Sequence, residues 1–93
     1  MWGVFEHRRV AGRLRRLPIE ILKQYEKWKD IGGVSGPRGL RMVKGFHDEA
    51  LQGQWKDARS SCLGLPYRVV YRVGEQEIRV LVIDSSAHGD HRR

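Results

Sequence analysis

Three side chains whose types suit acid–base chemistry on a phosphate ester lie in the second half of the chain. Glu49 is in a predicted loop, Arg68 is near the start of a predicted strand, and His88 follows the last predicted strand. A carboxylate can accept a proton, and an imidazole titrates near neutral pH and can donate one. A guanidinium can hold a phosphate through two parallel hydrogen bonds. These types indicate general acid–base catalysis beside a cation.

Each of the three residues also has an ordinary structural interpretation. Glu49 follows Asp48, and an acidic loop residue is most often simply solvated. Arg68 could pair with Asp84 on the neighbouring strand, and His88 could belong to a frayed tail. The residue types alone leave these alternatives open.

The charge of the chain points to a polyanionic partner. Eighteen Lys and Arg residues against eleven Asp and Glu residues give a net charge of +7, and thirteen of the eighteen are arginine. RNA, DNA and an acidic protein are the partner classes that such an excess favours. The single cysteine, Cys62, excludes an internal disulfide and fits a reducing compartment. With no signal-peptide pattern and no apolar run of about 20 residues, we expect a cytoplasmic protein without a membrane partner.

The first half of the chain predicts a strand and two helices. Residues 2–6 are aromatic and β-branched, which favours a strand. Apolar residues at helical spacing predict one helix over 7–17 and a second from Pro18 to Gly32-Gly33, where glycines would end it. Residues 32–45 then form a connector, in which Ser35-Gly36-Pro37 could start a short helical turn. The predicted buried stripes are Val10, Leu14 and Leu17 in the first helix, and Ile21, Leu22, Tyr25 and Trp28 in the second.

The second half predicts a loop followed by three strands. Residues 46–55 form the loop, and the strands cover 59–63, 67–73 and 77–84, with the last two joined as a hairpin by Gly74-Glu75-Gln76. The hairpin register pairs Val73 with Ile78, Tyr71 with Val80 and Val69 with Val82 on one face, and Arg72 with Arg79, Val70 with Leu81 and Arg68 with Ile83 on the other. One domain over residues 1–93 follows, with an α+β fold in which two N-terminal helices pack on one face of a four-stranded sheet.

Neither a cofactor nor a metal is predicted. The glycines do not match the GxxxxGK[ST] pattern of a phosphate-binding loop. The nearest approach to metal-ligand spacing is His88-x-x-His91, which has no second ligand cluster.

Several segments in this order carry a resemblance to a known family. They are Arg15-Arg16-Leu17-Pro18, Glu49-x-Leu51-x-Gly53-x-Trp55, Arg59, Tyr67-Arg68-Val69-Val70-Tyr71-Arg72-Val73, and His88. The chain resembles the RelE superfamily of toxin ribonucleases, in particular its YoeB- and YafQ-like branch, over nearly its whole length.

The resemblance implies a RelE-like fold with a mainly antiparallel sheet, and a type II toxin that cleaves messenger RNA in the ribosomal decoding site without a metal. It also implies a cognate antitoxin as partner. In that chemistry Glu49 is the base, Arg68 holds the phosphate, and His88 is the acid. Further residues expected to contact RNA or phosphate are Arg59, as a second cation, and His47, Lys56, Arg72 and His91.

The tail departs from the family pattern. Many relatives carry a tyrosine just after the terminal histidine or arginine, where this chain has Gly89-Asp90-His91. His91 is therefore the alternative to His88 as the acid. The alternative function for the whole chain is a non-catalytic basic module on the same fold that binds RNA, DNA or protein.

Overall fold

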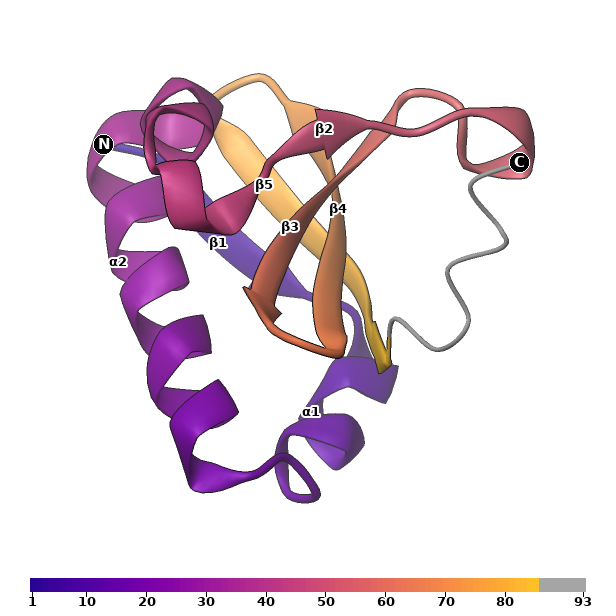
Figure 1. Cartoon of the computed structure of the whole chain (residues 1–93). Coiled ribbons are helices and arrows are strands. Elements are labelled where there is room, and N and C mark those ends of the chain that lie inside the picture. Colours follow the sequence, from indigo (N-terminus) through magenta and orange to yellow (C-terminus); the bar gives the residue numbers. More distant parts are fainter. Residues whose placement is uncertain (86–93) are drawn as a thin grey trace.

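Two helices cover one face of a five-stranded sheet (Figure 1). The computed structural model describes residues 1–85. The helices are α1 (Arg8–Leu14) and α2 (Ile19–Met42), with two short 3₁₀ turns, η1 (Lys44–Phe46) and η2 (Gly53–Trp55). The strands are β1 (Gly3–Glu6), β2 (Glu49–Ala50), β3 (Ala58–Gly64), β4 (Tyr67–Gly74) and β5 (Glu77–Ser85). No helix within residues 1–85 has the length and apolarity that crossing a membrane requires.

The sheet runs in the order β1-β5-β4-β3-β2, and it is mixed. β1 pairs in parallel with β5, and the other neighbours are antiparallel. The predicted α+β fold with two N-terminal helices on a mainly antiparallel sheet is confirmed. The strand count of four was wrong, because the two residues of β2 lie inside the predicted loop and extend the sheet beyond β3.

The second helix is longer than predicted. Gly32 and Gly33 do not end α2, which continues to Met42. Gly32 is buried, and a Cβ there would lie 3.1 Å from Ile78 Cδ1, so this glycine allows the helix to approach β5 closely. The interruption comes at Gly36, whose φ of 71° breaks the helical path, and Pro37 opens the next segment. The helical turn predicted from Ser35-Gly36-Pro37 is therefore confirmed, as the second part of α2.

The core between helices and sheet is built on three aromatic rings. Tyr25 and Trp28 of α2 stack with ring centroids 5.8 Å apart, and Trp28 meets Tyr71 of β4 edge to face at 5.3 Å. All three side chains are fully buried. The α2 stripe predicted from helical spacing is thus confirmed at Tyr25 and Trp28, and also at Ile21, whereas Leu22 is only half-buried.

A β-bulge changes the predicted register of the β4–β5 hairpin. The pairs of Val73 with Ile78, Tyr71 with Val80 and Arg72 with Arg79 are confirmed. Beyond Tyr71 the register shifts by one residue. The predicted partners of Val69, Val70 and Arg68 were therefore wrong: the observed pairs are Val69 with Ile83, Val70 with Val82, and Arg68 with Asp84. An extra residue in one strand has this effect, because it moves every later pair by one.

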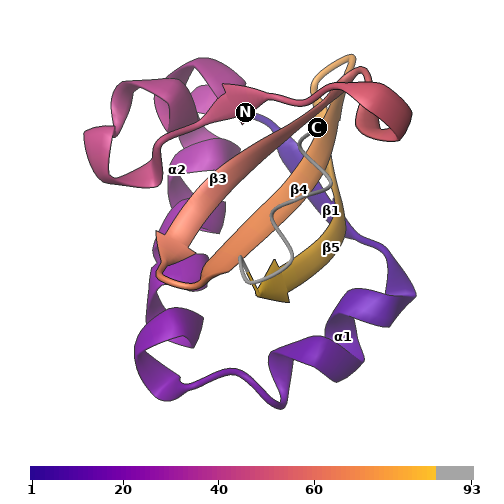
Figure 2. The same ribbon diagram turned by 45° about the vertical axis from the view of Figure 1, so that its right-hand side comes forward.

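The sheet face away from the helices carries a second, smaller apolar cluster. Leu51, Ala58 and Val70 are buried there, and Trp55, Leu81 and Val82 pack against them. We call this the open face, because α1 and α2 lie on the other side (Figure 2). The side chains of alternate residues in β4, including Arg68 and Arg72, belong to it.

Candidate active site

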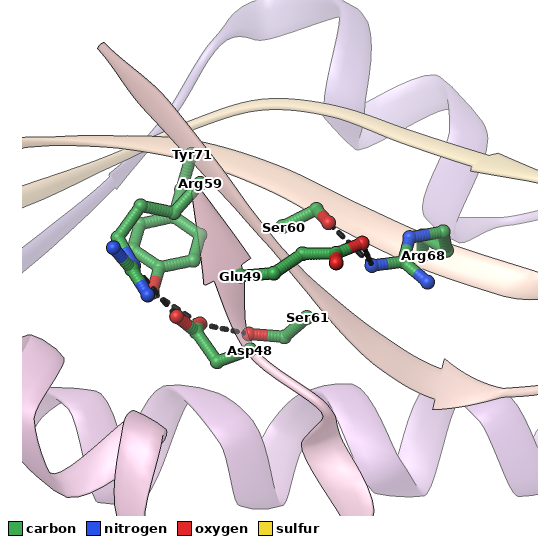
Figure 3. Close-up of polar contacts among 7 residues, drawn as sticks. All are labelled: Asp48, Glu49, Arg59, Ser60, Ser61, Arg68 and Tyr71. Atoms are coloured by element: carbon green, nitrogen blue, oxygen red, sulfur yellow. Dashed lines mark hydrogen bonds and ion pairs between the residues drawn. The ribbon is translucent and has the colours of Figure 1, made fainter. Parts of the chain in front are cut away.

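Two neighbouring carboxylates at the start of β2 point to opposite sides of the sheet. Consecutive residues of an extended chain point to opposite sides. Asp48 turns toward the helix side, where its side chain is completely buried, and Glu49 turns toward the open face, where 48% of its side chain is exposed (Figure 3). Because β2 pairs with β3 at Glu49–Ser60, the position of Glu49 is fixed relative to the sheet.

Three donors surround the Asp48 carboxylate. Arg59 Nε donates to Oδ1 at 2.6 Å, Ser61 Oγ donates to Oδ2 at 2.7 Å, and the Tyr71 hydroxyl also donates to Oδ2 (Figure 3). A buried carboxylate is tolerated when it is paired and hydrogen-bonded in this way. The network ties the residue before Glu49 to both β3 and β4.

The same network shifts two pKa values. Burial raises the pKa of Tyr71, and its hydrogen bond to Asp48 raises it further. Burial alone would lower the pKa of Arg59, but the hydrogen bond and the charge of Asp48 outweigh that effect, so the pKa of Arg59 is raised. Both shifts favour a neutral tyrosine and a cationic arginine on the carboxylate.

Glu49 and Arg68 meet on the open face. Arg68 Nη2 lies 2.9 Å from Glu49 Oε2 and donates to Ser60 Oγ at 2.5 Å (Figure 3). The Arg68 side chain is 13% exposed, so β3 and β4 hold it in place. Within residues 1–85, its Nε and Nη1 have no hydrogen-bond partner. The arrangement presents a fixed guanidinium beside a partly solvated carboxylate, which together can bind an anion and accept a proton.

The other expected site residues are more scattered. Arg59 pairs with Tyr71 in the sheet register and is bound to Asp48, so it lies on the opposite face of β3 from Ser60. Arg72 is exposed on the open face, four residues along β4 from Arg68, a distance of roughly 13 Å at the usual rise of a strand.

The remaining candidates are exposed residues on the segments that flank β2, or they lie beyond the described residues. His47 is exposed at a left-handed position with φ of 44° after η1, and Lys56 is exposed at the end of η2. His88 and His91 lie outside the described residues, 1–85.

Sequence reasoning missed the supporting residues Asp48, Ser60, Ser61 and Tyr71. The sequence did contain a signal for Tyr71. A tyrosine at a buried strand position usually needs a hydrogen-bond partner for its hydroxyl, so a polar neighbour could have been expected there. The identity of that partner depended on how the loop before β2 approaches the sheet, which no residue spacing encodes.

Known proteins match this chain by structure and not by sequence. No family model matches the sequence, and no curated protein does. Among solved structures, RelE in the archaeal RelE-RelB complex from Pyrococcus horikoshii OT3 has a TM-score of 0.72 at 25% identity, over 90% of this chain and 93% of that one. The YoeB-YefM complex from Staphylococcus aureus gives 0.71 at 11% identity (90% and 95% covered), and YafQ from E. coli gives 0.64 at 15% (95% and 97% covered).

The chain therefore has the fold of the RelE superfamily of toxins, as the resemblance predicted. Within that superfamily, the matched structures include RelE, YoeB and YafQ, and the match covers nine-tenths or more of this chain in each of these three cases.

Proposed function

We propose that this protein is the toxin of a type II toxin–antitoxin system and an endoribonuclease that cleaves messenger RNA in the ribosomal decoding site. The observation that carries the proposal is the contact between Glu49 and Arg68, 2.9 Å apart on the open face of a RelE-like fold. A proton acceptor next to a fixed guanidinium is the pair that attack of a ribose 2′-hydroxyl on its own phosphodiester requires.

In the proposed reaction, Glu49 takes the proton of the 2′-hydroxyl, and the 2′-oxygen attacks the neighbouring phosphorus. Arg68 binds the phosphate and offsets the charge that grows on its oxygens. His88 gives a proton to the departing 5′-oxygen, with His91 as the alternative donor. The bond from phosphorus to the 5′-oxygen breaks, leaving a 2′,3′-cyclic phosphate and a 5′-hydroxyl.

A phosphate entering the site has a direct competitor. Glu49 occupies Nη2 of Arg68, while Nε and Nη1 have no partner within residues 1–85. A phosphate can therefore bind the guanidinium and loosen its hold on the carboxylate, which frees Glu49 to accept a proton at the moment that substrate arrives. Arg72, Lys56 and His47 contact the RNA around the cut, and Arg59 contributes through Asp48, which it holds.

The partner of the free protein in this proposal is a cognate antitoxin. Two of the matched toxins were solved in complexes, with RelB and with YefM. A net charge of +7 suits an antitoxin segment rich in carboxylates as well as RNA. The protein would act in the cytoplasm, where translating ribosomes are found.

Primer extension on messages from translating ribosomes tests the proposal. We expect cleavage that leaves a 2′,3′-cyclic phosphate, at a rate unchanged by a chelator that removes transition metals and leaves the Mg²⁺ of the ribosome in place. Glu49→Gln should abolish cleavage, because it removes the proposed base. Glu75→Gln is its matched control and should cleave normally, since Glu75 is an exposed carboxylate in the β4–β5 turn. Loss of cleavage on chelation would instead indicate a metal nuclease.

The binding-module alternative makes a different prediction. A protein that only binds RNA leaves messages intact, and its affinity falls steeply with salt while it tolerates Glu49→Gln. Tight RNA binding without cleavage, on ribosomes or off them, would therefore replace the proposed activity with that alternative.

A further inference from the structure

A hollow lined by three arginines lies between α1 and the end of β5. Figure 2 shows the two elements that border it. β1 pairs with β5 from Glu77 to Val80, and beyond that point α1 runs beside β5 instead. The space consists of two adjoining hollows, of about 400 Å³ and about 260 Å³. The lining residues are Arg9, Val10, Gly12, Arg13 and Arg16 from the α1 segment, and Val82, Ile83 and Asp84 from β5.

The three guanidinium groups belong to one side of the helical segment. Arg9, Arg13 and Arg16 follow one another at i, i+4 and i+7, which is the spacing of neighbours on a helix face. The N–H of Arg16 donates to the carbonyl of Arg13 at 3.0 Å, so the turn continues past the last residue of α1. Gly12 lies among them, and a Cβ at this position would meet no other atom within 4 Å. The glycine therefore leaves space between the arginines.

Arg13 is held in place by the sheet. Its Nε donates to the carbonyl oxygen of Ile83 at 3.1 Å, and its Nη2 lies 4.0 Å from Asp84 Oδ1. Arg9 Nε donates to His7 Nδ1 at 3.2 Å. The lining residues carry three guanidinium groups against one carboxylate, so an excess of positive charge remains to attract an anion.

The hollow is next to the candidate active site. Asp84, which lines it, is paired with Arg68 in the sheet register, and adjacent strands lie roughly 4.8 Å apart. Val82, which also lines it, is paired with Val70 of the open face. The hollow offers the half-buried side chain of Val82 beside the arginine cations, whereas Val10 and Ile83 are fully buried. An apolar contact bordered by cations suits a nucleotide, which has an apolar base face next to a charged phosphate.

We propose that the Arg9–Arg13–Arg16 hollow binds the backbone of the substrate RNA next to the nucleotides held at Arg68, so that one strand of RNA runs from the active site across β5 to α1. The identity of this RNA as substrate rests on the proposed function. An extended peptide fits less well, because adding a strand to this edge requires free backbone groups and Arg13 already occupies the carbonyl of Ile83.

Fluorescence anisotropy with a short, labelled 2′-O-methyl RNA tests the proposal without cleavage, since this RNA has no 2′-hydroxyl to attack. The test variant is Arg9→Gln/Arg16→Gln. Its matched control is Arg8→Gln/Arg15→Gln, which removes the same charge from two exposed arginines that do not line the hollow. The test variant should bind roughly tenfold more weakly or worse. The slope of log affinity against log salt should fall by about 1.4, since each phosphate contact to a single strand contributes about 0.7.

Gly12→Leu supplies a test that leaves the charge unchanged. The added side chain takes up room between the arginines, and it should weaken RNA binding while Gly12→Ala does not. Equal losses in the two double-glutamine variants, or unchanged binding in Arg9→Gln/Arg16→Gln, would overturn the proposal. A polyglutamate peptide serves as a second probe. If Arg9→Gln/Arg16→Gln loses affinity for this peptide but not for RNA, the proposal is overturned and the hollow is assigned to an acidic protein.

The binding experiment and the cleavage experiment can fail independently, so they test this inference and the proposed function separately. If the hollow binds RNA as expected and no message is cleaved, the nuclease activity is wrong and the binding site stands. If messages are cleaved and the hollow variants bind the RNA normally, the nuclease activity stands and this inference is wrong.

Discussion

Arg68 and Glu49 are 19 residues apart in the chain, and their side chains meet at 2.9 Å on the open face of the sheet. The sheet fixes the position of both residues. Arg68 is a largely buried side chain of β4, and Glu49 is held by its pairing with Ser60 of β3. Three neighbouring strands thus bring a carboxylate and a guanidinium together, and the expectations below depend on that geometry.

Replacing Arg68 by lysine should impair cleavage although the charge is kept. Lysine is a point charge and cannot give the planar two-bond grip of a guanidinium, and it also loses the contact that Arg68 Nη2 makes with Ser60. We expect a fall in the single-turnover rate of roughly 100-fold, the size found when one such charge-stabilising donor is removed. Arg79→Lys is the control and should retain most activity, because Arg79 is an exposed arginine of the neighbouring strand with no assigned role in the site. Equal rates in the two variants would argue against a bidentate role.

Asp48→Asn should destabilise the fold. The substitution removes a charge that Arg59, Ser61 and Tyr71 all contact, and it leaves the Arg59 guanidinium without its counter-ion. Breaking a buried ion pair in this way costs about 3 kcal/mol, which urea unfolding can measure. Asp57→Asn is the control, because Asp57 is exposed and has a φ of 75° that asparagine also tolerates; a change below about 0.5 kcal/mol is expected there. Similar losses in both variants would mean that the Asp48 network contributes little.

Stability should fall in strong alkali because of the buried tyrosines. Burial and then the hydrogen bond to Asp48 raise the pKa of Tyr71 above the ordinary tyrosine value of about 10. In the unfolded chain Tyr71 loses its proton near pH 10, whereas the folded protein keeps it. Its contribution to stability is therefore complete below pH 10 and is lost as the pH rises from there toward the folded-state value, by up to about 1.4 kcal/mol per pH unit.

Tyr71→Phe checks that dependence. The variant should lose less free energy of unfolding between pH 9 and pH 11 than the wild type, because it has one fewer group to ionise on unfolding. Tyr25→Phe should act in the same direction, since burial first and the hydrogen bond to Glu6 second also raise the pKa of Tyr25. Identical alkaline slopes in all three proteins would contradict the assigned burial of these hydroxyls.

Replacing Gly12 and Gly32 by alanine should change the stability of the fold in opposite directions. Gly12 lies inside α1 with open space around its missing Cβ, so Gly12→Ala should stabilise the fold by ~0.5–1 kcal/mol through helix propensity. Gly32 also lies in a helix, but a Cβ there would lie 3.1 Å from Ile78 Cδ1 and 3.5 Å from Leu40 Cδ1. Gly32→Ala should therefore destabilise, and thermal unfolding of the pair shows the sign of each. A stabilising Gly32→Ala would mean that the close approach of α2 to β5 is not needed.

Much of this fold could be predicted from local patterns. Helical spacing identified Tyr25 and Trp28 as core, and alternation placed Tyr71 opposite Val80. The errors came where tertiary packing decides. Gly32 has the residue type of a helix end, yet it serves the contact between α2 and β5.

For the candidate site, the chemistry of the side chains could be predicted from the sequence, but the contact between them could not. The types of Glu49 and Arg68 indicated their chemistry, and their contact depended on β2, a strand of two residues with no pattern of its own. The β-bulge that pairs Arg68 with Asp84 has no signal in alternating hydrophobicity, since it inserts one residue into a continuous apolar run. The role of Asp48 became apparent only from its three donors.

The central claim is that Glu49 and Arg68, with His88 from the C-terminal segment, act on one phosphodiester. The most direct measurement is the single-turnover rate of message cleavage on translating ribosomes by Glu49→Ala, Arg68→Ala and His88→Ala. We predict that each variant loses roughly 100-fold or more while still binding ribosomes. Cleavage at the wild-type rate by all three variants would contradict the claim.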